Sequence, residues 1–296
     1  MTPATPSAGA MPVARPDPAS TPRLSVIVIT KNESARLPTC LASVAFADEL
    51  IVVDSGSTDG TAELARRLGA RVIETTDWPG FGPQKQRALD VAAGTWVLSI
   101  DADEWVDAEL AAAIRGVVGG CAATGGPAKA LQIQAPDQAA GYVVGRMSAF
   151  CGHWMHAGSW YPDRGVRLFR RGRARFSQDQ VHERLLLDGV AGRQLPGLLL
   201  HNSISSLQDG LDKMNRYTSG RAVELRARGR KGGLGQALGH GLWAFIRAYG
   251  LRRGFLDGRL GFVLAMLDAQ ASYYRHLKLW LDGQDSVHEL PPPRRR

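Results

Sequence analysis

The chain contains little cysteine. Its three cysteines, Cys40, Cys121 and Cys151, are far apart in 296 residues, and no Cys-x-x-Cys pair occurs. An odd number of isolated cysteines argues against a disulfide framework and against a cysteine-based zinc site. The pattern fits a protein of a reducing compartment.

Long apolar runs are also missing. No segment approaches the roughly 18 consecutive apolar residues that a membrane-spanning helix needs. The first 22 residues contain six prolines among Ala, Ser and Thr, and they lack the apolar core of a signal peptide. We therefore interpret residues 1–22 as a disordered leader, and we expect a cytoplasmic protein.

Three common enzyme motifs are absent. The sequence has no Gly-x-x-x-x-Gly-Lys-Ser/Thr phosphate loop, no Gly-x-Gly-x-x-Gly dinucleotide motif and no Gly-x-Ser-x-Gly nucleophile elbow. These absences count against an NTPase, a dinucleotide-dependent dehydrogenase and an α/β-hydrolase.

Acidic residues are outnumbered by basic ones. The chain has 36 Lys and Arg against 28 Asp and Glu, which gives a net charge of +8. Such an excess indicates an anionic partner, which can be a phosphate compound, nucleic acid or an acidic membrane surface. No recognised nucleic-acid-binding motif occurs, so we expect no nucleic acid partner.

Strand-like and helix-like segments alternate in the first third of the chain. Four segments rich in β-branched residues are separated by apolar residues at helical spacing; they are 24–30, 49–54, 71–73 and 95–100. This alternation predicts an α/β fold with a doubly wound sheet. Ligands bind such sheets outside the carboxyl ends of the strands, so the residues that follow the strands are the candidates for binding.

Acidic side chains follow two of these strands. Asp54 ends the second, and Asp101 and Asp103 stand at the end of the fourth. Residues two apart in extended backbone share a face, so Asp101 and Asp103 can point the same way. Neighbouring carboxylates repel unless a cation lies between them, and Mg²⁺ commonly takes one or two protein carboxylates together with substrate phosphates. The pair is either a clamp for a metal-bound diphosphate or an acidic exposed turn.

Two further polar segments also have alternative interpretations. The segment Ser55–Thr61 supplies hydroxyl groups at the ligand edge, or it is a helix-capping turn in which Asp59 caps the next helix. Lys85 and Arg87, just before the fourth strand, either reach a bound nucleotide or lie on a solvated helix face.

Three segments together resemble the family 2 glycosyltransferases, which have the GT-A fold. They are LSVIVITKNE at 24–33, IVVDSGSTDGT at 51–61 and LSIDADE at 98–104. The resemblance implies transfer of a sugar from a nucleotide diphosphate sugar donor, with inversion at the transferred carbon. It also implies a divalent cofactor, Mg²⁺ or Mn²⁺, held by the Asp-x-Asp segment.

The same resemblance implies residue roles in the donor half. Thr30, Asn32 and Glu33 would border the nucleoside pocket. The other implied substrate-binding residues are Asp54 and Ser57 near the nucleoside, Lys85 and Arg87 at the donor site, and Asp101 at the ribose. Asp101 and Asp103 would hold the metal.

A second group of segments resembles the subgroup that adds glucose to the inner-core heptose of lipopolysaccharide. These segments are Trp160–Asp163, Arg167–Arg170 and Val181–Glu183. The resemblance implies Trp160, Arg167 and Arg170 as substrate-binding residues, and Glu183 as the base, with His182 orienting it or approaching the metal.

The expected reaction also requires a catalytic base. An inverting transferase needs a carboxylate or histidine to take the proton of the acceptor hydroxyl, and the candidates are Asp163, Asp179, His182 and Glu183. Alternatively, Glu183 only pairs with a neighbouring arginine.

The C-terminal third is helical and basic by its pattern. Apolar residues recur at helical spacing in three segments beside several arginines, which suits either a peripheral helix on an anionic membrane or packing on the catalytic domain. We expect a leader at 1–22, a catalytic domain at 23–205 and a helical extension at 206–296. Within the catalytic domain, the donor half is 23–107 and the acceptor half is 141–205.

The expected acceptor is an anionic lipid-linked saccharide. Two alternatives stay open at this point. The acceptor is a polyprenyl phosphate that attacks without a protein base, or the chain is a non-catalytic protein that binds nucleotide sugars or serves as a membrane scaffold.

Overall fold

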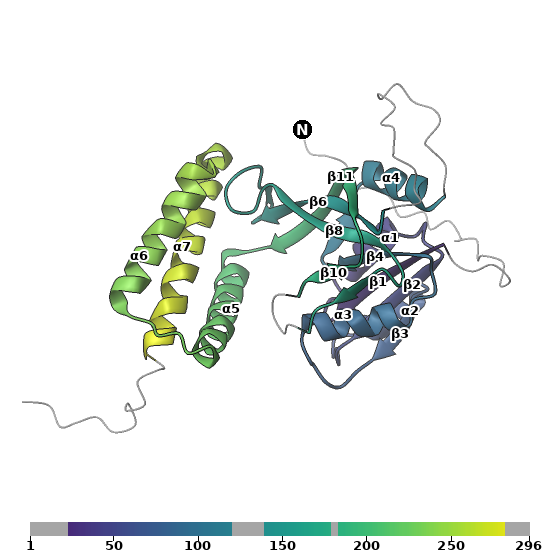
Figure 1. Cartoon of the computed structure of the whole chain (residues 1–296), viewed down its shortest axis with the longest axis horizontal. Helices are drawn as coiled ribbons and strands as arrows, with labels where there is room; N and C mark the ends of the chain where they lie inside the picture. The colour runs from purple at the N-terminus through teal and green to yellow at the C-terminus, as the bar shows by residue number, and fades with distance from the viewer. Residues whose placement is uncertain (1–22, 120–138, 179–182, 282–296) are drawn as a thin grey trace, which may run out of the picture. The chain divides into compact units, whose positions relative to one another are not determined.

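The computed structural model describes residues 23–119, 139–178 and 183–281 (Figure 1). The chain forms two compact units. The first comprises the residues up to 143 together with 166–195, and the second comprises 144–165 together with 196–296. Each unit is described separately below.

A parallel sheet forms the centre of the first unit. Its strands lie in the order β3 (Arg71–Glu74), β2 (Glu49–Asp54), β1 (Leu24–Thr30) and β4 (Trp96–Asp101). In the parallel register Thr30 pairs with Asp54, and Ile29 pairs with Asp101. The chain therefore delivers these acidic residues to one edge of the sheet, at the carboxyl ends of β2 and β4.

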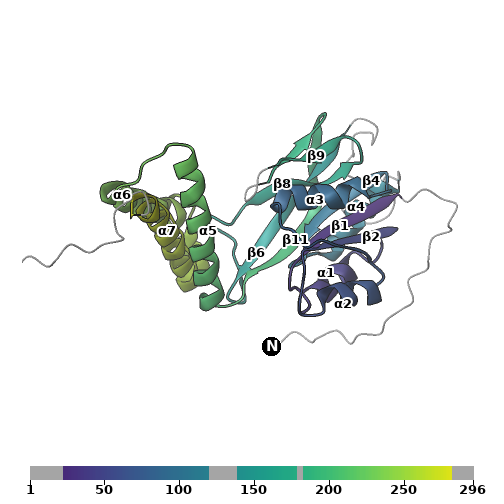
Figure 2. The ribbon, with the colours of Figure 1, turned by 90° about the horizontal axis from the view of Figure 1, so that it is seen from below.

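Helices cover both faces of this sheet. Helices α1 (Leu37–Ser43) and α2 (Thr61–Arg67) lie on one face, and α3 (Phe81–Asp90) lies on the other (Figure 2). Strands β1 and β2 are almost wholly apolar because both of their faces are covered. The core under α3 includes Ile27, Ile51, Ala88, Leu89 and Phe169.

The remaining strands extend the sheet. Strand β8 (Asp163–Arg170) pairs antiparallel with β4, so that Trp96 lies opposite Arg170 and Leu98 opposite Leu168. The order continues through β6 (Gly141–Phe150), β11 (Ala191–Ile204) and β5 (Glu104–Val106), while β7 (His153–Trp154) pairs with β6. A separate hairpin joins β9 (Ala174–Phe176) to β10 (Leu185–Leu187), and α4 (Ala108–Val118) follows β5.

Helices make up most of the second unit. Helix α7 (Gly258–Leu281) packs against α5 (Leu207–Ala227) and α6 (Leu234–Phe245) (Figure 1). A π-helical segment, η1 (Ile246–Leu251), continues α6, and a short 3₁₀ helix, η2 (Gly254–Asp257), leads into α7. The core of this unit contains Phe150, Met155, Ile204, Leu264 and Leu267.

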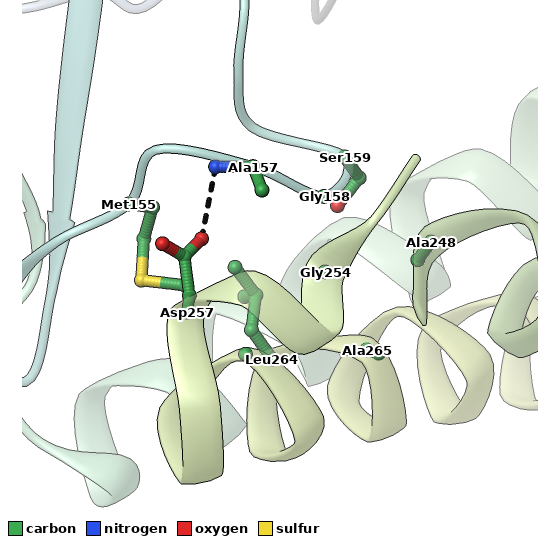
Figure 3. Close-up of a pocket in the computed structure, with 10 residues that line it drawn as sticks. Met155, Ala157, Gly158, Ser159, Ala248, Gly254, Asp257, Leu264 and Ala265 are labelled. Atoms are coloured by element: carbon green, nitrogen blue, oxygen red, sulfur yellow. Dashed lines mark hydrogen bonds between the residues drawn. The ribbon is translucent and has the colours of Figure 1, made fainter. Parts of the chain in front are cut away.

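Asp257 fixes the loop after β7 to the helices of the second unit. Its carboxylate accepts a hydrogen bond from the backbone N–H of Ala157 at 2.9 Å (Figure 3). It accepts another from the backbone N–H of His156 at 3.0 Å. The side chain of Asp257 is only 8% exposed, so both bonds form away from bulk water. This arrangement satisfies a buried carboxylate and two backbone donors together.

The predicted fold class is confirmed: the chain has an α/β fold with a helical C-terminal region. The predicted strands match the observed ones closely, and the helix between the third and fourth of them, α3, begins at Phe81. The predicted domain boundaries stay a prediction. None of the helices described between residues 23 and 281 combines the length and the apolar character needed to cross a membrane.

Candidate active site

A buried lysine joins two acidic residues at the ligand edge of the sheet. Lys85 projects from α3 and is 4% exposed. Its Nζ atom lies 2.8 Å from Oδ1 of Asp101 and 2.7 Å from Oε1 of Glu183. The solvated-face alternative for Lys85 is therefore wrong, since both partners are carboxylates and the ammonium is covered.

The neighbouring carboxylates keep Lys85 in its charged form. Burial alone disfavours the ammonium, and the guanidinium of Arg167 opposes it too, but the carboxylates of Asp101 and Glu183 outweigh both effects. The pKa of Lys85 is therefore raised, and the side chain stays cationic. A fixed positive charge thus lies between Asp101, which is predicted to bind the donor, and Glu183, which is predicted to act as the base.

Glu104 and Arg167 support Asp101 from the other side. Glu104 is fully buried, and one of its oxygens accepts a hydrogen bond from the backbone N–H of Asp101 at 3.0 Å. Arg167 lies 3.3 Å from Glu104 and 3.9 Å from the second carboxylate oxygen of Asp101. Contacts with these charged side chains therefore hold the carboxyl end of β4 in place.

Negative charge is concentrated around the buried thiol of Cys40 on α1. Burial raises the pKa of this thiol most, and the carboxylates of Glu104, Asp101 and Asp103 raise it further. Because one thiol feels all three carboxylates, they lie in one neighbourhood. The Cys40 thiol itself donates weakly to the carbonyl oxygen of Asp101, with sulfur and oxygen 3.5 Å apart.

The geometry of Asp101 and Asp103 differs from the simple extended pattern. Strand β4 ends at Asp101, and Ala102 and Asp103 form a turn before β5 begins at Glu104. The alternation of an extended strand therefore stops before Asp103. The two acids therefore belong to a strand end and a turn rather than to one extended strand.

Asp54 is at the centre of a hydrogen-bond network at the end of β2. Its carboxylate accepts from the hydroxyl of Thr30 at 3.0 Å, from the backbone N–H of Ser57 at 2.8 Å and from the Ser57 hydroxyl. Asp54 is 1% exposed, so these bonds satisfy a buried charge. The structure brings these three predicted site residues together.

Asn32 and Glu33 connect the first two loops. Asn32 has a left-handed backbone with φ of 57°; its N–H donates to Ser57 Oγ, and its Oδ1 accepts from the N–H of Thr58, both at 2.8 Å. Glu33 donates its N–H to Thr61 at 2.9 Å. The loop Ser55–Thr61 therefore braces the loop after β1. Asp59 also accepts from the N–H of Thr61 at 3.1 Å, in keeping with a turn-stabilising role.

Arg87 has different surroundings from Lys85. Its guanidinium forms a two-point ion pair with Asp77, with distances of 2.8 and 2.6 Å, and it also donates to Gln84. It is more than one third exposed, and this pairing raises its pKa. In this structure Arg87 holds the loop before α3, and its donor-site role stays a prediction.

The antiparallel register of β8 separates Arg167 from Arg170. Arg170 lies opposite Trp96, at the amino end of β4, and its guanidinium stacks 4.7 Å from the Trp96 ring. Arg167 instead reaches Asp101 at the carboxyl end. The structure thus brings Arg167, but not Arg170, to the acidic edge.

Of the other predicted residues, two belong to the second unit and two lie outside the described residues. Trp160 and Asp163 belong to the second unit, where Trp160 packs edge-on against Phe150 and Asp163 pairs with Arg146 at 2.6 Å. Their catalytic or binding roles stay predictions. His182 and Asp179 lie outside the described residues.

Glu104 is the residue that sequence reasoning did not select. It belongs to the quoted LSIDADE segment, and it is the fully buried acid of that segment. Its position directly after Asp103 was the signal in the sequence that could have identified it as a site residue. Asp77 was likewise not foreseen, because its link to Arg87 depends on how the loop before α3 folds.

The donor set fits a hard divalent ion. Within the described residues no three His, Cys, Asp or Glu side chains are arranged to hold a metal. Asp101 and Asp103 can supply one or two carboxylates, and Mg²⁺ or Mn²⁺ sites with few protein ligands are completed by water and substrate phosphates. The residues present are compatible with such a shared site.

Comparisons with known proteins cover most of the chain. The profile described as Glycosyl transferase family 2 matches residues 25–115. The lipopolysaccharide core biosynthesis glycosyltransferase LpsC of Rhizobium meliloti is 31% identical over 265 residues, covering 86% of this chain and 93% of that protein. An uncharacterized glycosyltransferase of Rickettsia prowazekii is 30% identical over 266 residues, covering 87% of this chain and 86% of its own length.

Solved structures give weaker similarities. A Pyrobaculum calidifontis mannosyltransferase in complex with GDP-Man and Mn²⁺ is 17% identical with a TM-score of 0.44, covering 93% of this chain and 79% of that one. Glucosyl-3-phosphoglycerate synthase from Mycobacterium tuberculosis, in complex with Mn²⁺, UDP-Glc and phosphoglyceric acid, is 35% identical over 28% of this chain and 34% of its own, with a TM-score of 0.26. Because its relatives match at 30% identity or more over most of their length, the chain belongs to glycosyl transferase family 2 and is a glycosyltransferase.

Proposed function

We propose that the protein transfers a sugar to a heptose of the lipopolysaccharide inner core in an inverting, divalent-metal-dependent reaction. Glucose from UDP-glucose is the proposed donor. The observation that carries the proposal is the buried ammonium of Lys85, which lies between Asp101 and Glu183 at the carboxyl edge of the sheet. The lipopolysaccharide core assignment printed for the Rhizobium relative supports the acceptor.

Asp101 and Asp103 would hold the metal in this proposal. When bound, the ion supplies charge neutralisation for the departing nucleoside diphosphate. Glu104 and Arg167 keep Asp101 in position through the hydrogen bond to its backbone and the charged contacts described above. The bonded network of Thr30, Asp54 and Ser57 would form the wall of the nucleoside pocket.

Glu183 is the proposed base. Its carboxylate would take the proton of the acceptor hydroxyl while that oxygen attacks the sugar carbon, and the bond to the diphosphate oxygen breaks. Lys85, 2.7 Å away, orients this carboxylate and stays protonated throughout because its pKa is raised. Positioned general bases of this kind contribute about a hundredfold to ten-thousandfold in rate.

The proposed acceptor is anionic and lipid-linked, and the enzyme would meet it at the cytoplasmic face of an anionic membrane. The net charge of +8 supports an anionic partner. A polyprenyl phosphate acceptor is the competing substrate, because its own phosphate oxygen attacks without needing a base.

A donor and acceptor screen tests the proposal. The purified full chain would be incubated with UDP-glucose and other nucleotide sugars, with Mg²⁺, Mn²⁺ or EDTA, and with either lipopolysaccharide core or a polyprenyl phosphate. We expect metal-dependent transfer to the core that is lost in Asp103→Ala and kept in Glu63→Ala, whose side chain is exposed on α2. Transfer in EDTA, or transfer only to the polyprenyl phosphate, contradicts the proposal.

A further inference from the structure

Large apolar side chains are exposed on the helices of the second unit. Leu238, Leu242 and Trp243 on α6, Leu251 in η1, Leu256 in η2 and Phe262 on α7 form what we name the outer apolar face. The exposed fractions of Leu251, Leu256 and Leu242 are 66%, 65% and 63%. Isolated exposed leucines are common in water-soluble proteins, but a cluster of this kind marks an interaction site.

Small residues occupy the inside of α6, η1 and the junction of η2 with α7, whereas the later turns of α7 also bury Leu264, Leu267 and Leu279. Ala237 and Gly241 are the buried residues of α6, Ala248 is the buried residue of η1, and Gly254 and Gly261 are buried where η2 meets α7. A Cβ atom on Gly241 would lie 3.2 Å from that of Tyr273 on α7, so the two backbones approach closely. Helix pairs in water usually bury their large apolar residues; small residues inside and large ones outside are the arrangement of helices in contact with lipid.

Aromatic rings of the same four elements contact one another. Tyr249 lies 5.4 Å from Phe245, 5.5 Å from Phe262 and 6.2 Å from Phe255, measured between ring centroids. These four rings come from α6, η1, η2 and α7. Aromatic contacts therefore connect the four elements that carry the outer apolar face, and Phe262 belongs to both sets.

The charges around this face are almost all positive. Between residues 234 and 267 the basic residues are Arg247, Arg252, Arg253 and Arg259, and all four are exposed. The single acid in that range is Asp257, which is buried and accepts hydrogen bonds from the backbone of His156 and of Ala157; Figure 3 shows the bond to Ala157. The next acid along α7, Asp268, is mostly buried and accepts a hydrogen bond from Ser159, so the surface combines apolar side chains with exposed arginines.

We propose that the outer apolar face docks on an anionic lipid bilayer. The leucines and Phe262 would enter the boundary between headgroups and acyl chains, and Trp243 would lie at the interface, where indole rings are favoured. Arg253 and Arg259 would contact anionic headgroups. A protein partner of mixed charge would not match a rim without exposed acids, whereas an anionic leaflet does.

The outer apolar face would be the place where the enzyme meets its lipid-linked acceptor, and this part of the inference rests on the proposed function. Its evidence is independent, because it comes from exposure, packing and charge in the second unit. Vesicle binding needs no sugar donor or acceptor, so the docking proposal and the proposed function can each fail without the other.

Vesicle co-sedimentation of the full chain tests the docking. Vesicles of pure phosphatidylcholine would be compared with vesicles containing phosphatidylglycerol at low salt. We expect tight binding to the anionic vesicles, weakened at least tenfold by Leu251→Ser/Leu256→Ser. The variant Arg253→Gln/Arg259→Gln should weaken anionic-vesicle binding by about tenfold to thirtyfold, since each basic residue near the surface contributes to the attraction. It should leave the weak binding to neutral vesicles unchanged.

Matched controls lie in the first unit. Val190, which is 76% exposed, is replaced by serine, and the exposed Arg175 is replaced by glutamine. Both controls should bind vesicles as the wild type does, and all variants should keep the wild-type melting temperature. Equal weakening by the controls, or no vesicle binding by the wild type, overturns the proposal. So does a dimer in sedimentation velocity that Leu251→Ser/Leu256→Ser converts to monomer without changing vesicle binding, because the face would then hold a second copy.

Discussion

The Nζ atom of Lys85 lies 2.8 Å from Oδ1 of Asp101, although the two residues belong to different elements of the first unit: the lysine is on α3 and the aspartate ends β4. The lysine is almost completely covered, while the aspartate side chain is 31% exposed. The pair therefore keeps its positive charge inside the protein, while the carboxylate of Asp101 is partly accessible to solvent.

Replacing Lys85 by methionine removes this internal charge. Asp101 and Glu183 would then lose the ammonium between them, so we expect the free energy of unfolding to fall by about 2–3 kcal/mol, less than for a fully buried pair because both acids are partly exposed. Chemical unfolding measures this. Lys231→Met, at an exposed lysine, should change stability by less than about 0.5 kcal/mol.

The pH dependence of the same variant has a definite sign. The folded-state pKa of Lys85 is raised above its ordinary value of 10.5, so its contribution to stability is complete below pH 10.5 and is lost as the pH rises through the folded-state value. The stability difference between wild type and Lys85→Met should therefore stay constant from pH 7 to 9 and shrink above pH 10.5. A difference that grows in that alkaline range would contradict this assignment.

Replacing Glu183 by glutamine should separate transfer from donor cleavage. The amide keeps the shape of the side chain but cannot accept the acceptor proton, so we expect transfer to fall by about a hundredfold or more. Hydrolysis of the donor without acceptor should fall much less. The measurement compares product formation with nucleotide release, and Glu63→Gln serves as control. Equal loss of both activities would indicate that Glu183 acts only through Lys85.

Glu104→Ala should destabilise the protein although it lies outside the predicted set of site residues. The variant leaves the backbone N–H of Asp101 and the guanidinium of Arg167 without this buried acceptor, which costs about 3 kcal/mol. Chemical unfolding measures the loss. Glu109→Ala, an exposed acid five residues later on α4, should shift stability by less than about 0.5 kcal/mol. Similar effects of both variants would show that Glu104 has no special support role.

Two glycines test the close packing inside the second unit. A Cβ atom on Gly261 would overlap the carbonyl oxygen of Gly254, so Gly261→Ala should cost about 3 kcal/mol or more. Gly235 has open space around its Cβ position on α6, so Gly235→Ala should stabilise the protein by up to about 1 kcal/mol. Thermal unfolding compares the two. A stable Gly261→Ala variant would mean that η2 and α7 can separate easily.

Local pattern was sufficient for the strands and most helices of the first unit. Apolar β-branched runs such as 24–30 and 49–54 have one stable position, inside a sheet covered on both faces, so their type and limits follow from composition. Because the carboxyl ends of parallel strands share an edge, Thr30, Asp54 and Asp101 could also be assigned to one site in advance.

The contacts of the site could not be predicted in the same way. The sequence shows Lys85 and Arg87 two positions apart on one helix, yet one is buried between two acids and the other pairs with Asp77 beside solvent. Helix rotation and the path of a distant loop decide this difference. Arg167 and Arg170 likewise look equivalent in sequence, and only the antiparallel register of β8 sends them to opposite ends of β4.

By itself, then, the sequence determined the α/β class, the sheet edge predicted to bind ligands, the family and the excess of positive charge, because each depends on neighbouring residues or on composition. The tertiary structure decided which charges meet: Lys85 with Asp101 and Glu183, and Glu104 with Arg167. It also decided that α6 and η2 turn their large apolar residues outward and their small ones inward. Such pairings join residues far apart in the chain, and their partners are fixed only when the elements pack.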